Sequence, residues 1–251
     1  MAKVVLFDGT LRPDRLVSLP ADDLGLTTGV TCFETLRSYN GRLLGLDEHL
    51  GRLEESARAM RVPFPGAELL RAEACDVLAR HGGDVVVRMT LTRGGHRIVV
   101  ASDVGPPPAS MRCASRTFEP PPWLPGSVKH GSRAGSVLVV ESLGVDEVIW
   151  VDRNGLVLEG TRTNVFAVKG GELHTPPLDG RIHHGVTRGL LLSLAPVREE
   201  SFRLDEPLDE LYASSTLKEL CPIVELDGRP APGGGPIGQE LAARFRRLVA
   251  G

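Results

Sequence analysis

The stretch SDVGPPPAS, residues 102–110, decides how this chain is divided. Three consecutive prolines can continue neither a helix nor a strand ladder, because proline has no amide hydrogen to donate. On both sides of this stretch the sequence contains helix and strand patterns. It therefore predicts a linker at 106–110 between two α+β domains, residues 1–105 and 111–251, and a ligand is expected in the cleft between them.

The residues before the linker contain both strand and helix patterns. Strands are expected at 3–9, 31–46 (around a turn at Tyr39–Gly41) and 84–102 (around a turn at Arg93–His96). A second helix is expected at 66–81. The first, over 46–60, has apolar residues at helical spacing: Leu46, Leu50, Leu53, Ala57 and Met60.

The residues after the linker repeat this mixture. We expect strands near 111–118, 146–151, 156–159 and 163–168, and helices near 131–143, 186–195 and 237–249.

Composition excludes several classes of protein. A net charge of −3 over 251 residues gives no reason to expect nucleic acid or an anionic membrane as partner. No apolar run reaches the roughly 18 residues that span a bilayer, and the N-terminus does not resemble a signal peptide, so a cytoplasmic location is expected. The four cysteines are scattered, with no histidine at metal-ligand spacing. Buried reduced thiols are expected, and no metal.

Lys129, in PGSVKHGSR (125–133), is one of only four lysines in a chain whose positive charge is mostly arginine. Lysine is needed where an amine must lose its proton and attack a carbon. Pro125 and Gly126 fix the approach, and Trp123 and Leu124 could supply apolar cover. From these residues alone, Lys129 is either an ordinary solvated lysine or a reactive amine.

Glu159 ends an apolar strand pattern in GLVLEGTRTNVFAV, residues 155–168. It is either an ordinary hairpin carboxylate or the partner of a basic ring nitrogen, in which case it would keep a pyridinium protonated.

Two later segments could hold a phosphate. Gly185, Val186 and Thr187 open a helix in HTPPLDGRIHHGVTRGLLL (174–192), and a helix N-terminus attracts anions. In YASSTLKEL (212–220), Ser214, Ser215 and Thr216 could donate hydroxyls or simply cap a turn.

Six segments in register resemble the class IV aminotransferase family, the pyridoxal-phosphate enzymes of fold type IV. They are GVTCFETLR, HLGRLEESA, KHGSRAGSVL, DEVIWVDRNGLVLEGTRTNVFAV, LHTPPLDGRIHHGVTRGLLL and DELYASSTLKELCPIVELDG. The resemblance implies a two-domain α+β fold like that of the D-amino-acid aminotransferases, with pyridoxal 5′-phosphate in the interdomain cleft. It also implies a small amino substrate and a homodimer.

The resemblance implies a role for individual residues. Lys129 is similar to the Schiff-base lysine that also moves the proton, and Glu159 to the carboxylate on the pyridine nitrogen. The implied phosphate ligands are Arg52, the backbone of Val186 and Thr187, and Thr216.

Two positions depart from the family pattern. His183 stands where an aliphatic residue is usual, so it could stack on the ring, reach substrate or turn away. Arg162 stands where small hydroxyl residues are common, and could bind an acidic substrate or pair on the surface.

The resemblance leaves three reactions open: those of aminodeoxychorismate lyase, D-amino-acid aminotransferase and branched-chain aminotransferase. In KHGSRAGSVL the adjacent histidine and the arginine four residues after Lys129 are similar to the lyase pattern, and Ala134 stands where branched-chain enzymes usually carry tyrosine. The short chain also favours the lyase. This enzyme releases pyruvate from 4-amino-4-deoxychorismate to give p-aminobenzoate for folate biosynthesis.

Candidate residues for the substrate are implied by the same resemblance. The D-amino-acid enzymes hold the carboxylate with an Arg and His pair, for which RGGHRI offers only imperfect substitutes. The substrate candidates are Phe33, Arg93, His96, Arg97, Arg133 and Arg162. A homologue that binds the cofactor without turnover is a further, less favoured interpretation.

Overall fold

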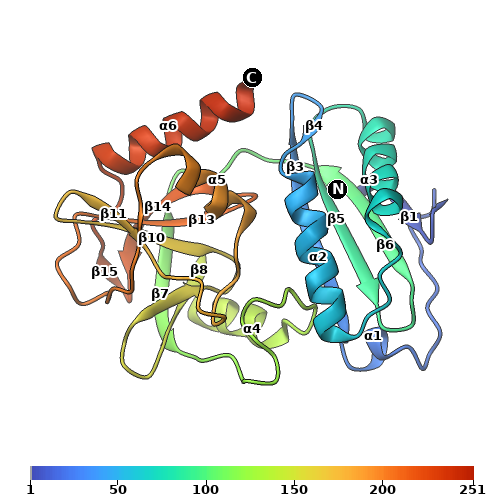
Figure 1. Cartoon of the computed structure of the whole chain (residues 1–251), viewed down its shortest axis with the longest axis horizontal. Coiled ribbons are helices and arrows are strands. Elements are labelled where there is room, and N and C mark those ends of the chain that lie inside the picture. The colour runs from blue at the N-terminus through green and yellow to red at the C-terminus, as the bar shows by residue number, and fades with distance from the viewer. Residues whose placement is uncertain (1) are drawn as a thin grey trace. The chain divides into compact units, whose positions relative to one another are not determined.

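A computed structural model describes residues 2–251, and the chain forms two compact units (Figure 1). Unit 1 runs up to Gly105 and also includes Val128–Arg133 and Ala250. Unit 2 comprises Pro106–Ser127, Ala134–Val249 and Gly251.

Unit 1 is built on a six-stranded antiparallel sheet with the order β2-β1-β6-β5-β3-β4. The strands are β1 (Ala2–Phe7), β2 (Thr10–Leu11), β3 (Thr31–Tyr39), β4 (Arg42–Leu43), β5 (Val85–Thr92) and β6 (Arg97–Asp103). A short helix, α1 (Leu24–Thr27), precedes β3.

Helices α2 (Leu46–Met60) and α3 (Ala67–His81) pack together on one face of this sheet (Figure 1). The apolar stripe of α2 enters the core there through Leu50, Leu53 and Ala57, as its helical spacing predicts. The strands meet it with every second residue, for example Cys32 and Leu36 of β3.

The opposite face of the unit 1 sheet carries the alternate residues of each strand, which point away from α2 and α3. The register pairs Phe33 with Thr90 and Thr90 with Ile98, so these three share this second face. Arg88 lies on it too, because it is two residues from Thr90 on β5.

Val128–Arg133 belongs to unit 1, whereas the sequence placed it in the second domain. The reason is backbone pairing along β3: Phe33 N–H donates to the Lys129 carbonyl (3.2 Å), and Gly131 N–H donates to the Thr31 carbonyl (2.8 Å). An added Cβ at Gly131 would lie 1.9 Å from Thr31 Oγ1, so only glycine allows this approach. The helix expected from 131 therefore begins later, at Ala134.

Unit 2 contains a nine-stranded mixed sheet with the order β12-β11-β10-β13-β14-β7-β8-β9, to which β15 adds beside β14. The strands are β7 (Met111–Thr117), β8 (Glu147–Val151), β9 (Val157–Gly160), β10 (Asn164–Lys169), β11 (Glu172–Thr175), β12 (Arg198–Glu199), β13 (Glu210–Ser215), β14 (Glu219–Leu226) and β15 (Arg229–Pro230). The helices are α4 (Ala134–Leu143), α5 (Val186–Leu194) and α6 (Pro236–Ala250).

Strands β13 and β14 are central to this sheet, yet the sequence reading did not place strands there. Five of the six residues of β13 are buried, so the strand lacks the alternation of apolar and polar residues that marks a half-buried strand. The expectation of buried thiols was also wrong at Cys75, which lies off the buried stripe of α3 and is exposed.

Helix α6 is anchored by one buried carboxylate. Glu210 of β13 accepts hydrogen bonds from Ile237 N–H (3.0 Å), Gly238 N–H (2.8 Å) and the Tyr212 hydroxyl (2.6 Å). A Cβ at Gly238 would lie 2.1 Å from the Tyr212 ring, so the first turn of α6 rests directly on this ring. Burial, followed by the hydrogen bond to Glu210, raises the pKa of Tyr212 above its ordinary range.

Candidate active site

Lys129 is half-buried in unit 1, with its backbone fixed on two sides. Its N–H donates to Ser56 Oγ on α2 (3.0 Å), and its carbonyl accepts from Phe33. Its Nζ lies 5.0 Å from the centroid of the buried Phe33 ring. The amine is therefore held at a defined place above the second face of the sheet.

Arg88, which the sequence analysis did not single out, lies over the same ring, with its guanidinium carbon 3.8 Å from the centroid of Phe33. Part of Arg88 is exposed, yet burial lowers its pKa, and the positive charge of Arg133 lowers it further. It makes no hydrogen bond or ion pair with any residue that the structure describes. The alternation in VVVRMTLT was the signal that could have identified it.

The Arg133 and His130 side chains follow Lys129 within the same short segment. Burial, and then the charge of Arg133, lowers the pKa of His130. Arg133 is half-buried and lies close enough to Arg88 to act on it electrostatically. Lys129, Arg88 and Arg133 thus make this part of unit 1 strongly positive, which suits an anionic ligand.

Arg97 and His96, two of the expected substrate residues, have other partners. Register pairs Arg97 with Leu91, on the core face and not on the face of Phe33. There Arg97 Nε donates to Glu73 of α3 (2.8 Å). His96 Nδ1 lies 2.8 Å from Asp8 Oδ2. The structure does not bring this pair to Lys129.

The Arg93 side chain is also engaged elsewhere, because its guanidinium donates to the carbonyls of Met60 and Arg61 at the end of α2.

Arg52, the expected phosphate ligand from α2, is buried beside Glu34 and His49. Its Nε donates to Glu34 Oε1 (2.6 Å) and its Nη2 to Glu34 Oε2 (2.7 Å), a bidentate pair. His49 Nδ1 also lies 2.7 Å from Glu34 Oε2. Burial would raise the pKa of Glu34, but the charge and hydrogen bonds of Arg52, with His49, hold it well below its usual range.

In the same cluster, burial lowers the pKa of His49, although Glu34 acts in the opposite direction. Arg52 is thus fixed in orientation by a fully buried carboxylate, which is how a phosphate-binding arginine is pre-organised.

Glu159, in unit 2, is tied to the segment that precedes α5. Glu159 Oε2 accepts from His183 N–H (2.9 Å), and the His183 carbonyl accepts from Asn164 Nδ2 (2.8 Å). The backbone of His183 therefore joins the carboxylate to the next strand. The sequence drew attention to the side chain of His183, whereas its backbone makes these contacts, and Asn164 was not predicted.

The N-terminus of α5 has the features of an anion site. Gly185 is its N-cap and makes no side-chain cap, so the first N–H groups of the helix, those of Val186 and Thr187, have no partner within the helix. An added Cβ at Gly185 would lie 2.1 Å from Asn164 Oδ1. Register pairs Asn164 with Ser214, whose buried Oγ has no hydrogen-bond partner among the described residues.

These donors fit a phosphate: backbone N–H groups, the Ser214 hydroxyl and, two residues further on, the half-buried Thr216. The donor set thus matches the group expected there.

Arg162 lies on the surface of unit 2 and pairs there. It is 55% exposed, its Nη2 donates to the Asp146 carbonyl (2.9 Å), and its Nε lies 4.0 Å from Glu147. Of the two alternatives for Arg162, the structure shows the surface pairing.

Glu147, fully buried, accepts from the hydroxyls of Thr161 and Thr163, and this fixes the turn that follows Glu159. No metal-binding group of His, Cys, Asp or Glu side chains is found in residues 2–251.

Unit 1 thus holds an amine at a fixed place, and unit 2 holds a fixed carboxylate and a helix N-terminus that suits an anion. In comparison with known proteins, the family model described as amino-transferase class IV matches residues 31–226. The chain belongs to this family, whose members are enzymes that use pyridoxal 5′-phosphate.

Relatives and solved structures are similar along the whole chain. A putative branched-chain-amino-acid aminotransferase of Methanocaldococcus jannaschii is 30% identical over 97% of this chain and 96% of its own. A D-alanine aminotransferase of Bacillus licheniformis is 27% identical over 92% of this chain and 91% of its own.

The branched-chain aminotransferase structure of Thermoproteus uzoniensis superimposes with a TM-score of 0.90 at 27% identity, covering 100% of this chain and 95% of its own. A hypothetical aminotransferase from Mycobacterium tuberculosis, solved in a PLP-bound form, gives 0.86 at 27% identity, with 98% of both chains covered. The expected family and the expected α+β fold type are confirmed.

Proposed function

We propose that this protein is an aminotransferase that moves the amino group of an α-amino acid to a 2-oxo acid. The observation that carries the proposal is the arrangement around Phe33, where the Lys129 amine and the Arg88 guanidinium lie over one ring. A guanidinium next to a reactive amine suits a substrate that has both a carboxylate and an amino group. The D-alanine and branched-chain relatives act on such substrates by name.

We assign the cofactor-binding residues as the family resemblance implies them. In unit 2, Thr216 and the N-terminus of α5 (Val186 and Thr187) would bind the phosphate, and Glu159 would meet the pyridine nitrogen. In unit 1, Arg52 would bind phosphate. When bound, pyridoxal phosphate supplies the electron-withdrawing ring that stabilises charge on the substrate carbon.

Lys129 Nζ is the base that takes the proton from the substrate α carbon and moves it away from that carbon, because the α carbon leaves as the carbonyl carbon of a 2-oxo acid. The bidentate hold of Glu34 keeps Arg52 from turning away, and the His183 N–H keeps the Glu159 carboxylate in place. Arg88 orients the substrate carboxylate, and the ring of Phe33 keeps water from one side of the amine.

Aminodeoxychorismate lyase, the activity that the sequence favoured, is the second candidate. It rests on the KHGSR segment, where His130 and Arg133 follow Lys129 at the spacing of the lyase pattern. Two cations near the amine, the guanidinium groups of Arg88 and Arg133, also suit a substrate with two carboxylates. The named relatives are aminotransferases, so they support amino transfer rather than lyase activity.

The experiment begins with cofactor binding. Purified protein is loaded with pyridoxal phosphate, and Lys129→Ala should lose the visible absorbance of the lysine-bound cofactor. Lys169→Ala is the matched control, because Lys169 pairs with Glu206 on the surface. A wild-type protein that cannot be loaded would overturn both candidate activities. Loading without either activity would favour a homologue that binds the cofactor without turnover.

Amino transfer is then tested with D-alanine, L-alanine and branched-chain donors against 2-oxoglutarate, and pyruvate release is measured from 4-amino-4-deoxychorismate without acceptor. Transfer without pyruvate release from the latter supports the aminotransferase. Pyruvate release without transfer supports the lyase and contradicts the main proposal.

We also propose a homodimer in the cytoplasm. Helix α4 has no buried residue in the single chain, although it is strongly apolar, and Val137 and Leu138 are 50% and 62% exposed. Such a surface is typical of a protein interface. None of the helices in residues 2–251 has both the length and the apolar composition needed to cross a bilayer.

A further inference from the structure

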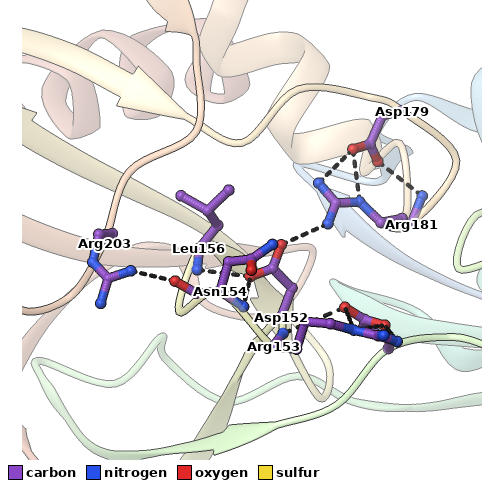
Figure 2. A network of polar contacts seen from close by, with 8 residues as sticks. Asp152, Arg153, Asn154, Leu156, Asp179, Arg181 and Arg203 are labelled. Atoms are coloured by element: carbon purple, nitrogen blue, oxygen red, sulfur yellow. Dashed lines mark hydrogen bonds and ion pairs between the residues drawn. The ribbon is translucent and has the colours of Figure 1, made fainter.

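Within unit 2, Arg181 ties the segment between β11 and α5 to Asp152. We call Asp179–Gly185 the 179–185 segment. Arg181 Nη1 donates to Asp152 Oδ2 (2.9 Å), and Arg181 Nε donates to Asp179 Oδ2 (2.7 Å). Figure 2 shows the guanidinium between the two carboxylates. One planar side chain thus joins the segment to the turn between β8 and β9.

Asp152 is a rigid anchor for this ion pair. It is 3% exposed, and its Oδ1 accepts from Asn154 N–H and Leu156 N–H, each at 2.9 Å (Figure 2). Burial would raise the pKa of Asp152, but these hydrogen bonds and Arg181 hold it below its ordinary value. A carboxylate with its acceptors filled in this way has little freedom to move.

The backbone of the segment is also packed tightly. An added Cβ at Gly126 would lie 1.9 Å from the Arg181 carbonyl oxygen, so the backbone of Gly126 lies directly against it. Ile182, the next residue, is 2% exposed and packed in the interior. The segment therefore cannot move toward Gly126 without a clash, and movement away from Asp152 would break the Arg181–Asp152 ion pair.

Two residues after Arg181, the same segment reaches the cofactor residues. His183 N–H donates to Glu159 (2.9 Å), its carbonyl accepts from Asn164 (2.8 Å), and Gly185 begins α5. A shift at Arg181 would therefore move both the donor that holds Glu159 and the start of the helix that supplies the phosphate-binding N–H groups.

We propose that Arg181 is a positioning residue for the cofactor: it fixes the 179–185 segment so that the ring-nitrogen carboxylate and the phosphate-binding helix keep one spacing. This inference rests on the proposed function, because that assigns Glu159 and α5 to the cofactor. Arg181 acts through His183 and touches no cofactor atom in this scheme. Lysine cannot replace it fully, because a single ammonium lacks the planar fork that bridges two carboxylates.

The test compares three variants of the full-length protein: Arg181→Met, Arg181→Lys and the control Arg203→Met. Arg203 belongs to the same network, since it donates to the Asn154 carbonyl and to Asp205, but it makes no hydrogen bond or ion pair with the described residues of the 179–185 segment (Figure 2). Circular dichroism checks that each variant is folded.

Three readouts follow for each variant. They are the pyridoxal-phosphate dissociation constant, the pH dependence of the visible absorbance of the bound cofactor, and hydrogen exchange of the cofactor-free protein, compared between residues 182–188 and the rest of unit 2. If Arg181 served only general stability, the absorbance titration would not change and faster exchange would not be confined to residues 182–188.

We expect Arg181→Met to weaken cofactor binding about tenfold, to shift the absorbance titration and to accelerate exchange at 182–188. The cofactor dissociation constant of Arg181→Lys should lie between those of Arg181→Met and the wild type. That of Arg203→Met should lie within about twofold of the wild-type value.

The inference is overturned if the wild type binds the cofactor and Arg181→Met has the same dissociation constant and the same hydrogen exchange at 182–188 as the wild type. A wild type that binds no cofactor would instead overturn the proposed function. If Arg181→Met does not fold, Asp152→Asn replaces it, because the amide oxygen still accepts from Asn154 and Leu156 while the charge opposite Arg181 is lost. The same three readouts then decide.

Discussion

Replacing Glu34 by glutamine should be the most informative change in unit 1. Glu34 is fully buried and accepts three hydrogen bonds at 2.6–2.7 Å, two from Arg52 and one from His49. Glutamine keeps one acceptor oxygen but turns an NH₂ group toward the donors of Arg52. The guanidinium is left buried with its charge uncompensated.

The cost follows from the bonds that are lost. A hydrogen bond to a charged group contributes about 1.5–3 kcal/mol, and glutamine loses about two of the three. Removing one partner of a buried pair costs about 3–5 kcal/mol in general, which agrees. We therefore expect the free energy of unfolding of the cofactor-free protein to fall by about 3–5 kcal/mol near neutral pH.

The pH dependence has a definite sign. Because the folded state lowers the pKa of Glu34, its stabilising contribution is complete above the ordinary glutamate pKa of about 4.3 and is lost as the pH falls toward the lower folded value. The difference between wild type and Glu34→Gln should be constant near neutrality and shrink in acid.

The assay is denaturant unfolding followed by circular dichroism, with hydrogen exchange of β3 and α2 to localise the effect. The matched control is Glu54→Gln, because Glu54 faces Arg58 on the exposed side of α2. This change should stay within about 0.5 kcal/mol. A cost for Glu34→Gln no larger than that of Glu54→Gln would show that the buried cluster does not stabilise unit 1.

Three further changes test other parts of the structure. Gly238→Ala should loosen α6, since the new Cβ meets the Tyr212 ring at 2.1 Å; fast hydrogen exchange across α6 reports it, and unchanged exchange contradicts it. Arg88→Gln should raise KM for carboxylate substrates about tenfold and leave the visible cofactor band intact; an unchanged KM counts against a substrate role for Arg88 over Phe33. Leu138→Glu should shift the mass in sedimentation toward the monomer, whereas an unchanged mass places the interface elsewhere.

Much of the fold was predictable because its periodic segments are unambiguous. The apolar spacing of α2 and the alternation along β5 predicted both elements near their observed ends. Strand β13 could not be recognised, because burial on both faces removes the alternation of apolar and polar residues by which a strand is predicted.

The candidate site was predictable only where a residue type is chemically unusual for its surroundings. Lys129 stood out in an arginine-rich chain, and Glu159 stood at a strand end. Arg88 gave no such signal, because one arginine among many gains meaning only when the register places it over Phe33. Asp152 and Arg181 lie 29 positions apart, and no local pattern links them.

The short edge segment Val128–Arg133 has a consequence for how this protein can be taken apart. The chain leaves unit 1 after Gly105, returns for these six residues and leaves again. A gene fragment that ends at the proline linker therefore encodes a unit 1 without the strip that pairs with β3 and without the amine. A fragment that starts there carries the amine away from the strand that positions it. Neither half keeps Lys129 together with the strand that positions it, so this arrangement cannot be transferred to another protein, or exchanged between relatives, by a single cut.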